Sequence, residues 1–328
     1  MTPLRVVLAG CESPLRDVLR AWERFSRLHC AAVFTDLQRH ARDVARWLGP
    51  DVPVEPLEQL GTTSGAVRLS TARCDWLVSI GSTVLYPPEV LHAPALGGLN
   101  MHPGRLPDYA GLHVHQWAIR NGESTFGATI HWLDHRVDTG DIVVQSTFAL
   151  RGDESGLQLY RRCLRSGTEL MLEVLARIDA GQSLPRRPQD PARYRIYRAR
   201  DARHGTIDWT RPAVEVERFI RAADYVPFQS PTYTPETRCG DRGFRIRRAV
   251  LADEVASEKP GGIVRADEEG LVIACGDRRT VRATWIEDEQ GKRIAIGGPE
   301  SGRFELVSGR RFGPVAKATP RIASGEAA

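Results

Sequence analysis

The sequence predicts an α/β protein in which a domain built on a parallel sheet precedes a small β-barrel domain. In the first half, short apolar runs at residues 4–9, 31–34, 76–80 and 98–101 alternate with helical patterns. Beyond residue 205, shorter runs are separated by glycine and proline. Strands that alternate with helices are typical of parallel sheets with right-handed crossovers, whereas closely spaced short strands favour a barrel.

The helices of the first half follow from local signals. Ser13 and Pro14 are typical of a helix start, and apolar residues follow them at helical spacing. Two β-branched and aromatic runs, 126–133 and 142–150, predict strands on either side of a polar loop at 134–141. A long amphipathic pattern over residues 160–178 then predicts a helix that Gly181 ends.

A change in composition separates the two halves. Three prolines among many arginines, within residues 185–203, predict a linker. A helix at 213–223 and strands at 244–249, 262–264, 271–275 and 281–285 are expected after it. We therefore expect a catalytic domain at 1–190, a linker at 191–204, a β-barrel at 205–312 and a disordered tail at 313–328.

Composition is that of a soluble two-domain enzyme. The chain has 328 residues, of which 41% are hydrophobic and 26% charged. No apolar run approaches the roughly 18–20 residues that span a bilayer, so we interpret the protein as cytoplasmic with no membrane partner. The six cysteines form no C-x-x-C pair, so neither a metal site nor a disulfide framework is expected. A net charge of +4 does not require a nucleic-acid partner.

The densest functional signal is the segment 99–111, at the end of a predicted inner strand, where α/β sheets bind ligands. Asn100 and His102 are two residues apart, so they point to the same side of an extended strand. An amide donor beside an imidazole suits acyl transfer, since the amide stabilises an oxyanion while the imidazole handles a proton. Asp138, in the polar loop, could orient that imidazole. Each residue alone also has a structural explanation, as a strand-end pair or a turn aspartate.

Taken together, residues 100–111, 127–131 and 137–142 resemble the folate-dependent formyltransferases, which include methionyl-tRNA, sugar and glycinamide ribonucleotide formyltransferases. The family pattern is N-x-H-x-S-L-L-P-x-x-x-G, followed some three dozen residues later by a D-x-G loop. Here Asp138 lies 36 residues after His102 (138 − 102 = 36). The resemblance covers residues 4–175, and residues 207–277 are similar to the family's C-terminal barrel. It implies a Rossmann-like catalytic domain and an OB-like second domain.

The resemblance also implies roles for individual residues. Asn100, His102 and Asp138 are expected to be catalytic, with 10-formyltetrahydrofolate as the formyl donor. The expected pterin pocket is formed by Thr83, Val84, Leu85, Tyr86, Pro87, Asp134 and Val137. Apolar walls with a few backbone hydrogen bonds suit a flat pterin, although Leu85 and Tyr86 could equally be core residues.

Several positions depart from the family pattern. Gly104 and Arg105 replace the serine and the first leucine, and Ala110 replaces a frequent arginine. The expected substrate contacts are Arg105, Tyr109, His113 and His115. For the two histidines, a cap or a hydrogen-bonded core residue is the alternative, and no carboxylate or cysteine is placed beside them to complete a metal site.

The acceptor is less constrained than the donor. Seven arginines between 186 and 203 could serve tRNA or could be a solvated linker. The segment 221–231 looks more like formyltransferases of specialised metabolism, so we expect a small amine, either a hydroxyornithine-type amino acid or an amino-sugar. Methionyl-tRNA formyltransferase and 10-formyltetrahydrofolate hydrolase are the alternatives, and a homodimer stays open.

The sequence disfavours two further functional classes. A dinucleotide-dependent dehydrogenase needs the G-x-G-x-x-G turn, but residues 10–14 after the first strand lack its second and third glycines. A non-catalytic binding module, for RNA among others, is disfavoured by the intact trio of Asn100, His102 and Asp138.

Overall fold

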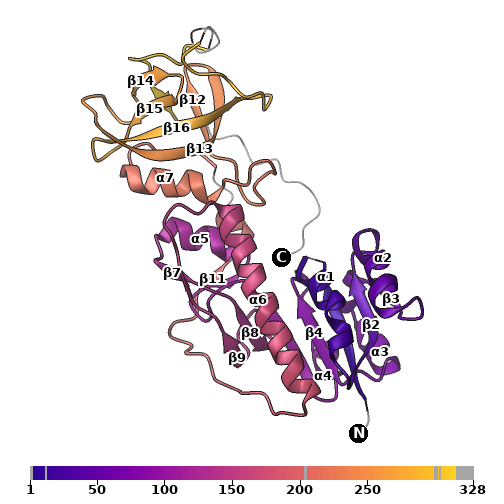
Figure 1. Cartoon of the computed structure of the whole chain (residues 1–328). Helices are drawn as coiled ribbons and strands as arrows, with labels where there is room; N and C mark the ends of the chain where they lie inside the picture. Colours follow the sequence, from indigo (N-terminus) through magenta and orange to yellow (C-terminus); the bar gives the residue numbers. More distant parts are fainter. Residues whose placement is uncertain (1–2, 12, 203–204, 299–301, 303, 315–328) are drawn as a thin grey trace. The chain divides into compact units, whose positions relative to one another are not determined.

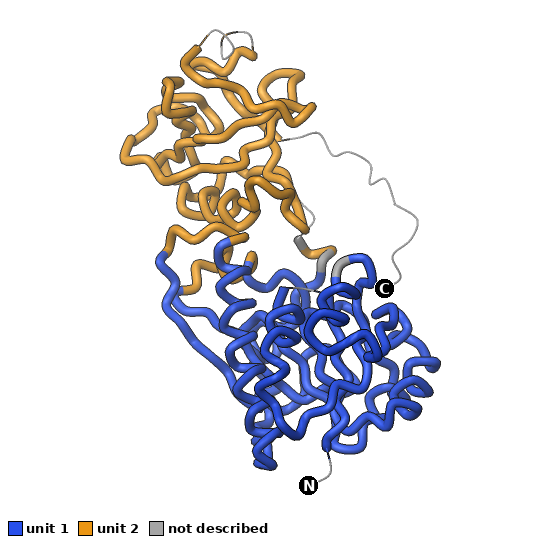
Figure 2. Tube along the Cα trace, turned by 45° about the vertical axis from the view of Figure 1, so that its right-hand side comes forward, with its two compact units in different colours: residues 1–115, 124–151, 158–198 blue, residues 116–123, 152–157, 199–328 orange. Residues whose placement is uncertain are grey.

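The structure is a computed structural model that describes residues 3–11, 13–202, 205–298, 302 and 304–314 (Figure 1). Residues 315–328 of the expected disordered tail therefore lie outside the described residues. The chain forms two compact units (Figure 2). Unit 1 comprises residues 1–115, 124–151 and 158–198, and unit 2 comprises residues 116–123, 152–157 and 199–328.

Unit 1 contains a seven-stranded sheet in the order β3-β2-β1-β4-β5-β8-β9. Its strands are β1 (Leu4–Gly10), β2 (Leu28–Thr35), β3 (Val54–Pro56), β4 (Trp76–Ile80), β5 (Gly97–His102), β8 (Thr129–Trp132) and β9 (Ile142–Gln145). The first five strands in this order are parallel, whereas β8 is antiparallel to β5 and β9 to β8. The predicted parallel α/β sheet is thus confirmed, with an antiparallel extension on one edge.

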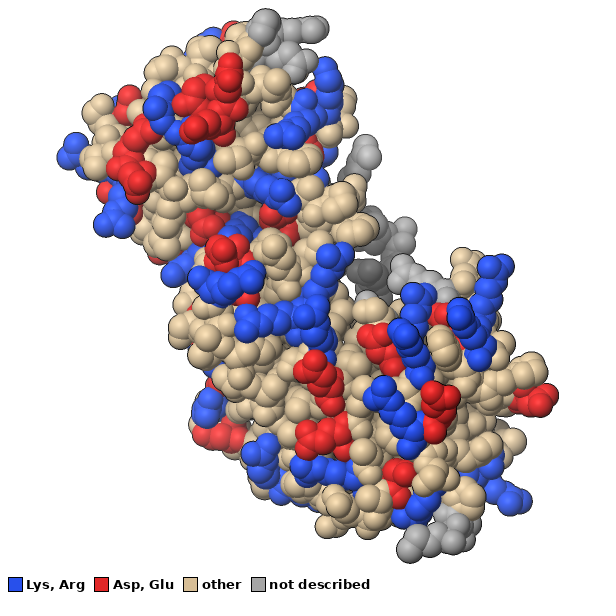
Figure 3. Space-filling view, viewed as in Figure 1, with Lys and Arg blue, Asp and Glu red and all other residues tan. Residues whose placement is uncertain are grey.

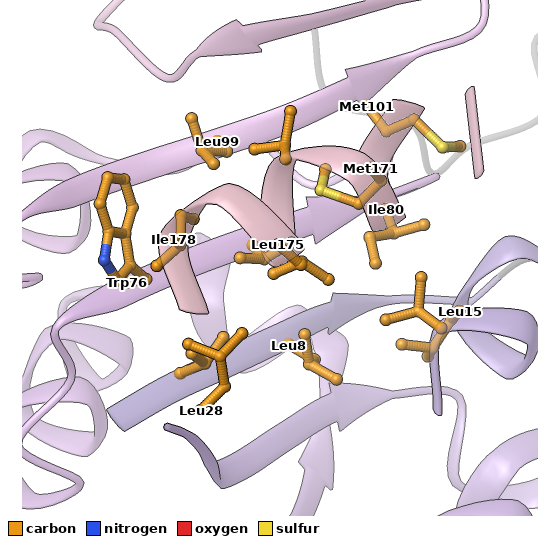
Figure 4. Packing of buried hydrophobic residues seen from close by; sticks show 14 of the residues in the cluster. Leu8, Leu15, Leu28, Trp76, Ile80, Leu99, Met101, Met171, Leu175 and Ile178 are labelled. Carbon is orange, nitrogen blue, oxygen red and sulfur yellow. The ribbon is translucent and has the colours of Figure 1, made fainter. Parts of the chain in front are cut away.

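Helical segments lie between and after these strands along the chain. They are α1 (Ser13–Arg20), η1 (Trp22–Arg24), α2 (Leu37–Leu48), η2 (Leu57–Gly61), α3 (Thr63–Thr71), α4 (Pro88–His92), α5 (Val114–Asn121) and α6 (Gly156–Asp179), of which α5 and α6 contribute residues to both units. In Figure 4, the side chains of Met171, Leu175 and Ile178 on α6 point toward the strands that carry Leu8 and Leu99. Full burial of each such side chain stabilises the fold by about 1.5–3 kcal/mol. Gly181, at a φ of 72°, ends the helical segment as predicted.

The two runs expected as unbroken strands, 126–133 and 142–150, are each divided. Their outer parts form a separate two-stranded sheet of β7 (Thr125–Phe126) and β10 (Phe148–Ala149). The division occurs where the backbones approach closely, since a side chain at Gly127 would collide with the carbonyl of Ser146. The expectation of two continuous strands was wrong, because the ladder is interrupted on either side of this close approach.

Residues 185–197, which we call the strap, belong to unit 1 and are hydrogen-bonded to the rest of it. Within them, β11 (Ile196–Tyr197) pairs in parallel with β6 (Ala110–Gly111). The backbones of Arg187 and Ile142 exchange hydrogen bonds of 2.8 and 3.1 Å. Arg195 donates to the carbonyl of Pro107 at 3.1 Å. The segment that composition presents as a linker is therefore hydrogen-bonded to the loop after β5 and to the start of β9.

Unit 2 contains a six-stranded antiparallel sheet in the order β14-β15-β16-β13-β12-β17, which confirms the predicted β-rich second domain. Its elements are η3 (Ala199–Ala202), α7 (Ala213–Ala222), β12 (Glu236–Cys239), β13 (Arg242–Val255), β14 (Ile263–Asp267), β15 (Gly270–Ala274), β16 (Arg279–Asp288) and β17 (Phe312–Gly313). α7 packs with the sheet around a core that includes Ile220, Phe244 and Ile273.

The cysteines and the helices can be compared directly with what the sequence led us to expect. None of the six cysteines, all of which lie in the described residues, forms a disulfide, and five of them are buried. Among the described helices, none combines the length and apolar character that a membrane span requires.

Candidate active site

Two of the predicted catalytic residues lie at the carboxyl end of β5, which is flanked by β4 and β8. Asn100 is partly buried, whereas His102 is only 4% exposed. In the antiparallel pair, Asn100 lies opposite His131 and His102 lies opposite Thr129. The strand thus presents both side chains at the edge where open α/β sheets bind ligands.

Asp138, from the loop after β8, completes the predicted trio. Its Oδ2 lies 3.4 Å from Nδ1 of His102 and accepts a 2.8 Å hydrogen bond from the backbone N–H of Gly111. Burial alone would raise the pKa of Asp138, but the imidazoles of His102 and His131 and the Gly111 N–H hold it well below its usual range. Asp138 is therefore a carboxylate at neutral pH, in direct contact with His102.

A second imidazole, His131, joins Asn100 to Asp138. Its Nε2 lies 3.1 Å from the amide nitrogen of Asn100 and 3.4 Å from Oδ1 of Asp138. Its Nδ1 lies 2.8 Å from the carbonyl oxygen of Trp132. Because a carbonyl only accepts, Nδ1 must carry hydrogen, which in the neutral ring leaves Nε2 to accept from Asn100. Sequence reasoning gave His131 no role, although the motif strand contained it and its place opposite Asn100 was the available signal.

His102 has an oxygen facing each ring nitrogen. Its Nε2 donates to the carbonyl of Tyr109 at 2.6 Å, while Nδ1 faces Asp138. Burial lowers the pKa of His102, and the Asp138 carboxylate and the Tyr109 carbonyl oppose that lowering. Both contacts are satisfied only in the imidazolium form, so the charge of His102 depends on the neighbouring carboxylate. Gly104 provides the room, because a Cβ there would lie 2.5 Å from Nε2.

The loop that carries Asp138 is tightly constrained. Asp138 itself has a φ of 55°, in the left-handed region. A side chain at Gly140 would collide with the carbonyl of Trp132, which explains why the D-x-G loop has glycine there. Asp134 accepts hydrogen bonds from the Thr139 hydroxyl at 2.7 and 2.8 Å, so its carboxylate is used within the loop.

Two strap residues, Gln189 and Tyr194, hold this loop by its backbone. The Gln189 amide donates to the carbonyls of Asp138 and Gly140, at 2.8 and 2.7 Å. The Tyr194 hydroxyl donates to the carbonyl of Val137 at 2.8 Å. Val137 was predicted to contact the donor, and the structure places it, half-buried, in this backbone contact. Neither strap residue was identified from the sequence.

The remaining residues predicted to bind the donor follow β4 directly: Thr83, Val84, Leu85, Tyr86 and Pro87. Val84 and Tyr86 pack on the core of unit 1, and the Tyr86 hydroxyl donates to Oγ of Ser79 at 3.0 Å. Burial raises the pKa of Tyr86. Leu85, in contrast, is 65% exposed and is the large apolar side chain that this segment presents to solvent.

The four predicted acceptor contacts have different surroundings. Tyr109 is buried and stacked on Tyr197, with ring centroids 5.3 Å apart. Arg105 donates to the Thr125 hydroxyl at 3.0 Å.

His113 is half-buried at the start of α5, with a φ of 55°. His115 is buried and stacked on Tyr160 at 4.7 Å, and its burial lowers its pKa to about 3. A role of any of the four in substrate binding stays a prediction.

Comparisons with known proteins identify the family of this chain. Residues 58–175 match the family model described as formyl transferase, and residues 201–298 match that of the formyl transferase C-terminal domain. Methionyl-tRNA formyltransferase of Paraburkholderia xenovorans is 31% identical over 256 residues, which are 78% of this chain and 75% of that protein. The enzyme of Paraburkholderia phymatum is 28% identical over 290 residues, 88% of this chain and 85% of that protein.

Solved structures show the same fold. The N-formyltransferase from Helicobacter canadensis, in complex with folinic acid and dTDP-3-aminofucose, has a TM-score of 0.62 at 18% identity. That similarity covers 87% of this chain and 99% of the other. HypX from Aquifex aeolicus, in complex with tetrahydrofolic acid, has a TM-score of 0.60 at 20% identity. That similarity covers 92% of this chain and 47% of HypX. The chain belongs to the formyl transferase family.

Proposed function

We propose that this protein transfers a formyl group from 10-formyltetrahydrofolate to the amine of a small substrate. The observation that carries the proposal is the contact between His102 and the Asp138 carboxylate, 3.4 Å apart, beside Asn100 at the end of β5. Amide, imidazole and carboxylate supply an oxyanion donor, a proton carrier and its counter-charge, which are the groups that acyl transfer needs.

Each group has a distinct task. Attack of a neutral amine on a formyl carbon forms a C–N bond and places negative charge on the formyl oxygen. The proton that the amine then loses balances the one that N10 of the donor gains as its bond to the formyl carbon breaks and tetrahydrofolate leaves. Asn100 uses one amide hydrogen on His131 and keeps the second for that oxygen. When protonated, His102 adds positive charge nearby, and the Asp138 carboxylate stabilises that form against the burial that lowers the pKa of His102. Loss of one oxyanion donor typically costs about 2.7–4 kcal/mol in the barrier.

A folate donor suits the residues around this edge of the sheet. The two similar structures described above were solved with folinic acid and with tetrahydrofolic acid. In this chain, the exposed Leu85 offers an apolar wall, and the backbone of residues 83–87 and of the 134–138 loop offers polar groups for a pterin. The chemistry supplied by the donor is an activated formyl group.

A small amine is favoured because two arginines of the strap already have partners within this chain. Arg193 makes hydrogen bonds of 3.0 and 2.5 Å to the carboxylate of Asp108. Arg186 lies over the ring of Trp132 and 3.9 Å from Asp141. Figure 3 shows basic and acidic side chains interspersed on the face in view. Proteins that bind tRNA depend on many free contacts between basic residues and phosphates.

Methionyl-tRNA is the second candidate acceptor, because the relatives that share 28–31% identity with this chain are methionyl-tRNA formyltransferases. The rate of formyl transfer should depend on salt differently for the two acceptors. Transfer to tRNA should weaken steeply as salt increases, whereas transfer to a small amine should not.

The test is a formyl-transfer assay with 10-formyltetrahydrofolate and three acceptors: charged initiator tRNA, N5-hydroxyornithine and nucleotide-linked amino-sugars. We expect turnover with a small amine, and we expect Asn100→Ala, His102→Ala and Asp138→Asn each to reduce it by at least about 10²-fold. Turnover with tRNA alone would refute the small-amine acceptor. Formate release without any acceptor would indicate a hydrolase, and near-normal turnover in any variant would refute the catalytic assignment.

A further inference from the structure

The strap contacts the loop that carries Asp138, and this contact suggests a role beyond connecting two units. We infer that Gln189 is a positioning residue for the proposed formyl transfer, and that it acts by fixing the backbone from which the Asp138 carboxylate reaches His102. The inference rests on the proposed function for its kinetic consequence, whereas the contact itself is independent of the substrate.

The geometry of the Gln189 amide is unambiguous. Its Nε2 donates to the carbonyls of Asp138 and Gly140, at 2.8 and 2.7 Å, so both amide hydrogens are used. Carbonyl oxygens only accept, so the reversed amide would place an oxygen against two oxygens. One side chain therefore holds two carbonyls, one on either side of Thr139.

The loop needs such support because its conformation is unfavourable for an L-amino acid. Asp138 has a φ of 55°, a left-handed conformation that residues other than glycine adopt uncommonly. Such a conformation persists only where surrounding contacts determine it. At one side of Asp138 the loop is fixed by Gln189, and at Gly140 it is packed against the carbonyl of Trp132.

The strap can deliver Gln189 accurately because its own backbone is anchored on both sides. Arg187 pairs with Ile142, and Arg195 donates to Pro107 and accepts from the N–H of Ala110 at 2.9 Å. Between these anchors, Tyr194 donates to the carbonyl of Val137. Gln189 and Tyr194 thus hold consecutive parts of the loop from one anchored segment.

The position of the loop matters for the chemistry because the Asp138 carboxylate favours the charged form of His102. It lies between two imidazoles, 3.4 Å from a nitrogen of each, and a small displacement of the loop would lengthen both contacts. Weaker pairing with His102 would lower the affinity of that imidazole for its proton. The expected result is slower turnover, together with loss of activity at a lower pH on the alkaline side of the profile.

The test compares Gln189→Met, which keeps length but removes both donors, with Gln182→Met as a matched control on an exposed glutamine after α6. Tyr194→Phe removes the second contact. We expect Gln189→Met to reduce kcat by about 10-fold or more, as for other residues that orient a catalytic group. We expect the KM for the amine to change less than about twofold, the alkaline limb to move to lower pH, and Tyr194→Phe to have a smaller effect in the same direction.

Nitrogen-15 NMR of the His102 ring gives a readout that does not need turnover. In Gln189→Met its titration midpoint should move to lower pH, whereas in Gln182→Met it should stay at the wild-type value. A kcat within twofold of wild type, or a loss of activity with an unchanged pH profile and an unchanged His102 titration, would overturn the positioning role. If wild-type protein transfers no formyl group, the proposed function fails while the titration still tests the contact.

Discussion

Replacement of His115 by phenylalanine should make unit 1 less sensitive to mild acid. The His115 ring is 2% exposed and stacks on Tyr160 with centroids 4.7 Å apart. Phenylalanine has a similar ring and keeps the stacking, but it has no proton to gain. The substitution therefore removes a titration while it preserves the packing.

The magnitude follows from the pKa of His115. Burial, with a smaller contribution from His113, lowers this pKa from 6.5 to about 3 in the folded protein. The unfolded chain then binds the proton more tightly, so the stabilising contribution is fully present above pH about 6.5 and decreases as the pH falls toward about 3. With these values, the free energy of unfolding decreases by about 2 kcal/mol between pH 7 and pH 5 on account of this residue alone.

Urea unfolding, followed by tryptophan fluorescence at pH 7 and at pH 5, measures this change in the free energy of unfolding. Wild-type protein should lose about 2 kcal/mol more than His115→Phe between pH 7 and pH 5. His29→Gln, which removes an exposed histidine from β2, is the control and should behave as wild type. Equal losses in wild type and His115→Phe, within about 0.5 kcal/mol, would show that His115 is accessible to protons in the folded state.

Three further outcomes are expected. His131→Phe should reduce kcat by about 10-fold in steady-state assays, because the Asn100 amide loses the acceptor 3.1 Å away, and wild-type kcat would contradict that contact. Gly140→Ala should lower the free energy of unfolding by about 1–3 kcal/mol in urea titrations, since the new methyl group collides with the carbonyl of Trp132; unchanged stability would show that the loop can move. Asp138→Asn should flatten the dependence of stability on pH below about 4, because the depressed pKa of Asp138 contributes stability that is lost as acid protonates the carboxylate. If the free energy of unfolding of Asp138→Asn and of the wild type depended on pH in the same way below about pH 4, this contribution of Asp138 would be refuted.

The elements predicted best from the sequence are those whose signal is local and periodic. β1, β2 and β4 are largely buried on both faces, so each contains a short run of mainly apolar residues. α6 carries an apolar stripe at helical spacing and a glycine after its last turn. Such features depend on neighbouring residues in the chain, which is why a single sequence reveals them.

The features that were missed depend on partners far apart in the chain. Gln189 contacts Asp138 across 51 residues, and a contact between an amide and a backbone carbonyl leaves no periodic pattern. The division at Gly127 has a similar origin, because the carbonyl of Ser146 that excludes a side chain there belongs to another strand run. A proline- and arginine-rich segment such as the strap is typical of a linker by composition, and only its hydrogen bonds show that it is part of unit 1.

The contacts around Asp138 also relate the protonation states of the site to one another. One carboxylate lies between His102 and His131, and it can balance the charge of one imidazolium in a buried site. Each of the two rings has an oxygen at both nitrogens, but Nε2 of His131 also faces the amide nitrogen of Asn100, which can only donate. An Nε2 that accepts from Asn100 leaves His131 neutral with its hydrogen on Nδ1, so a single imidazolium at this site is that of His102. The amide of the proposed oxyanion donor, Asn100, and the charge of His102 are thus linked through His131, a residue on the neighbouring strand that the N-x-H spacing does not include.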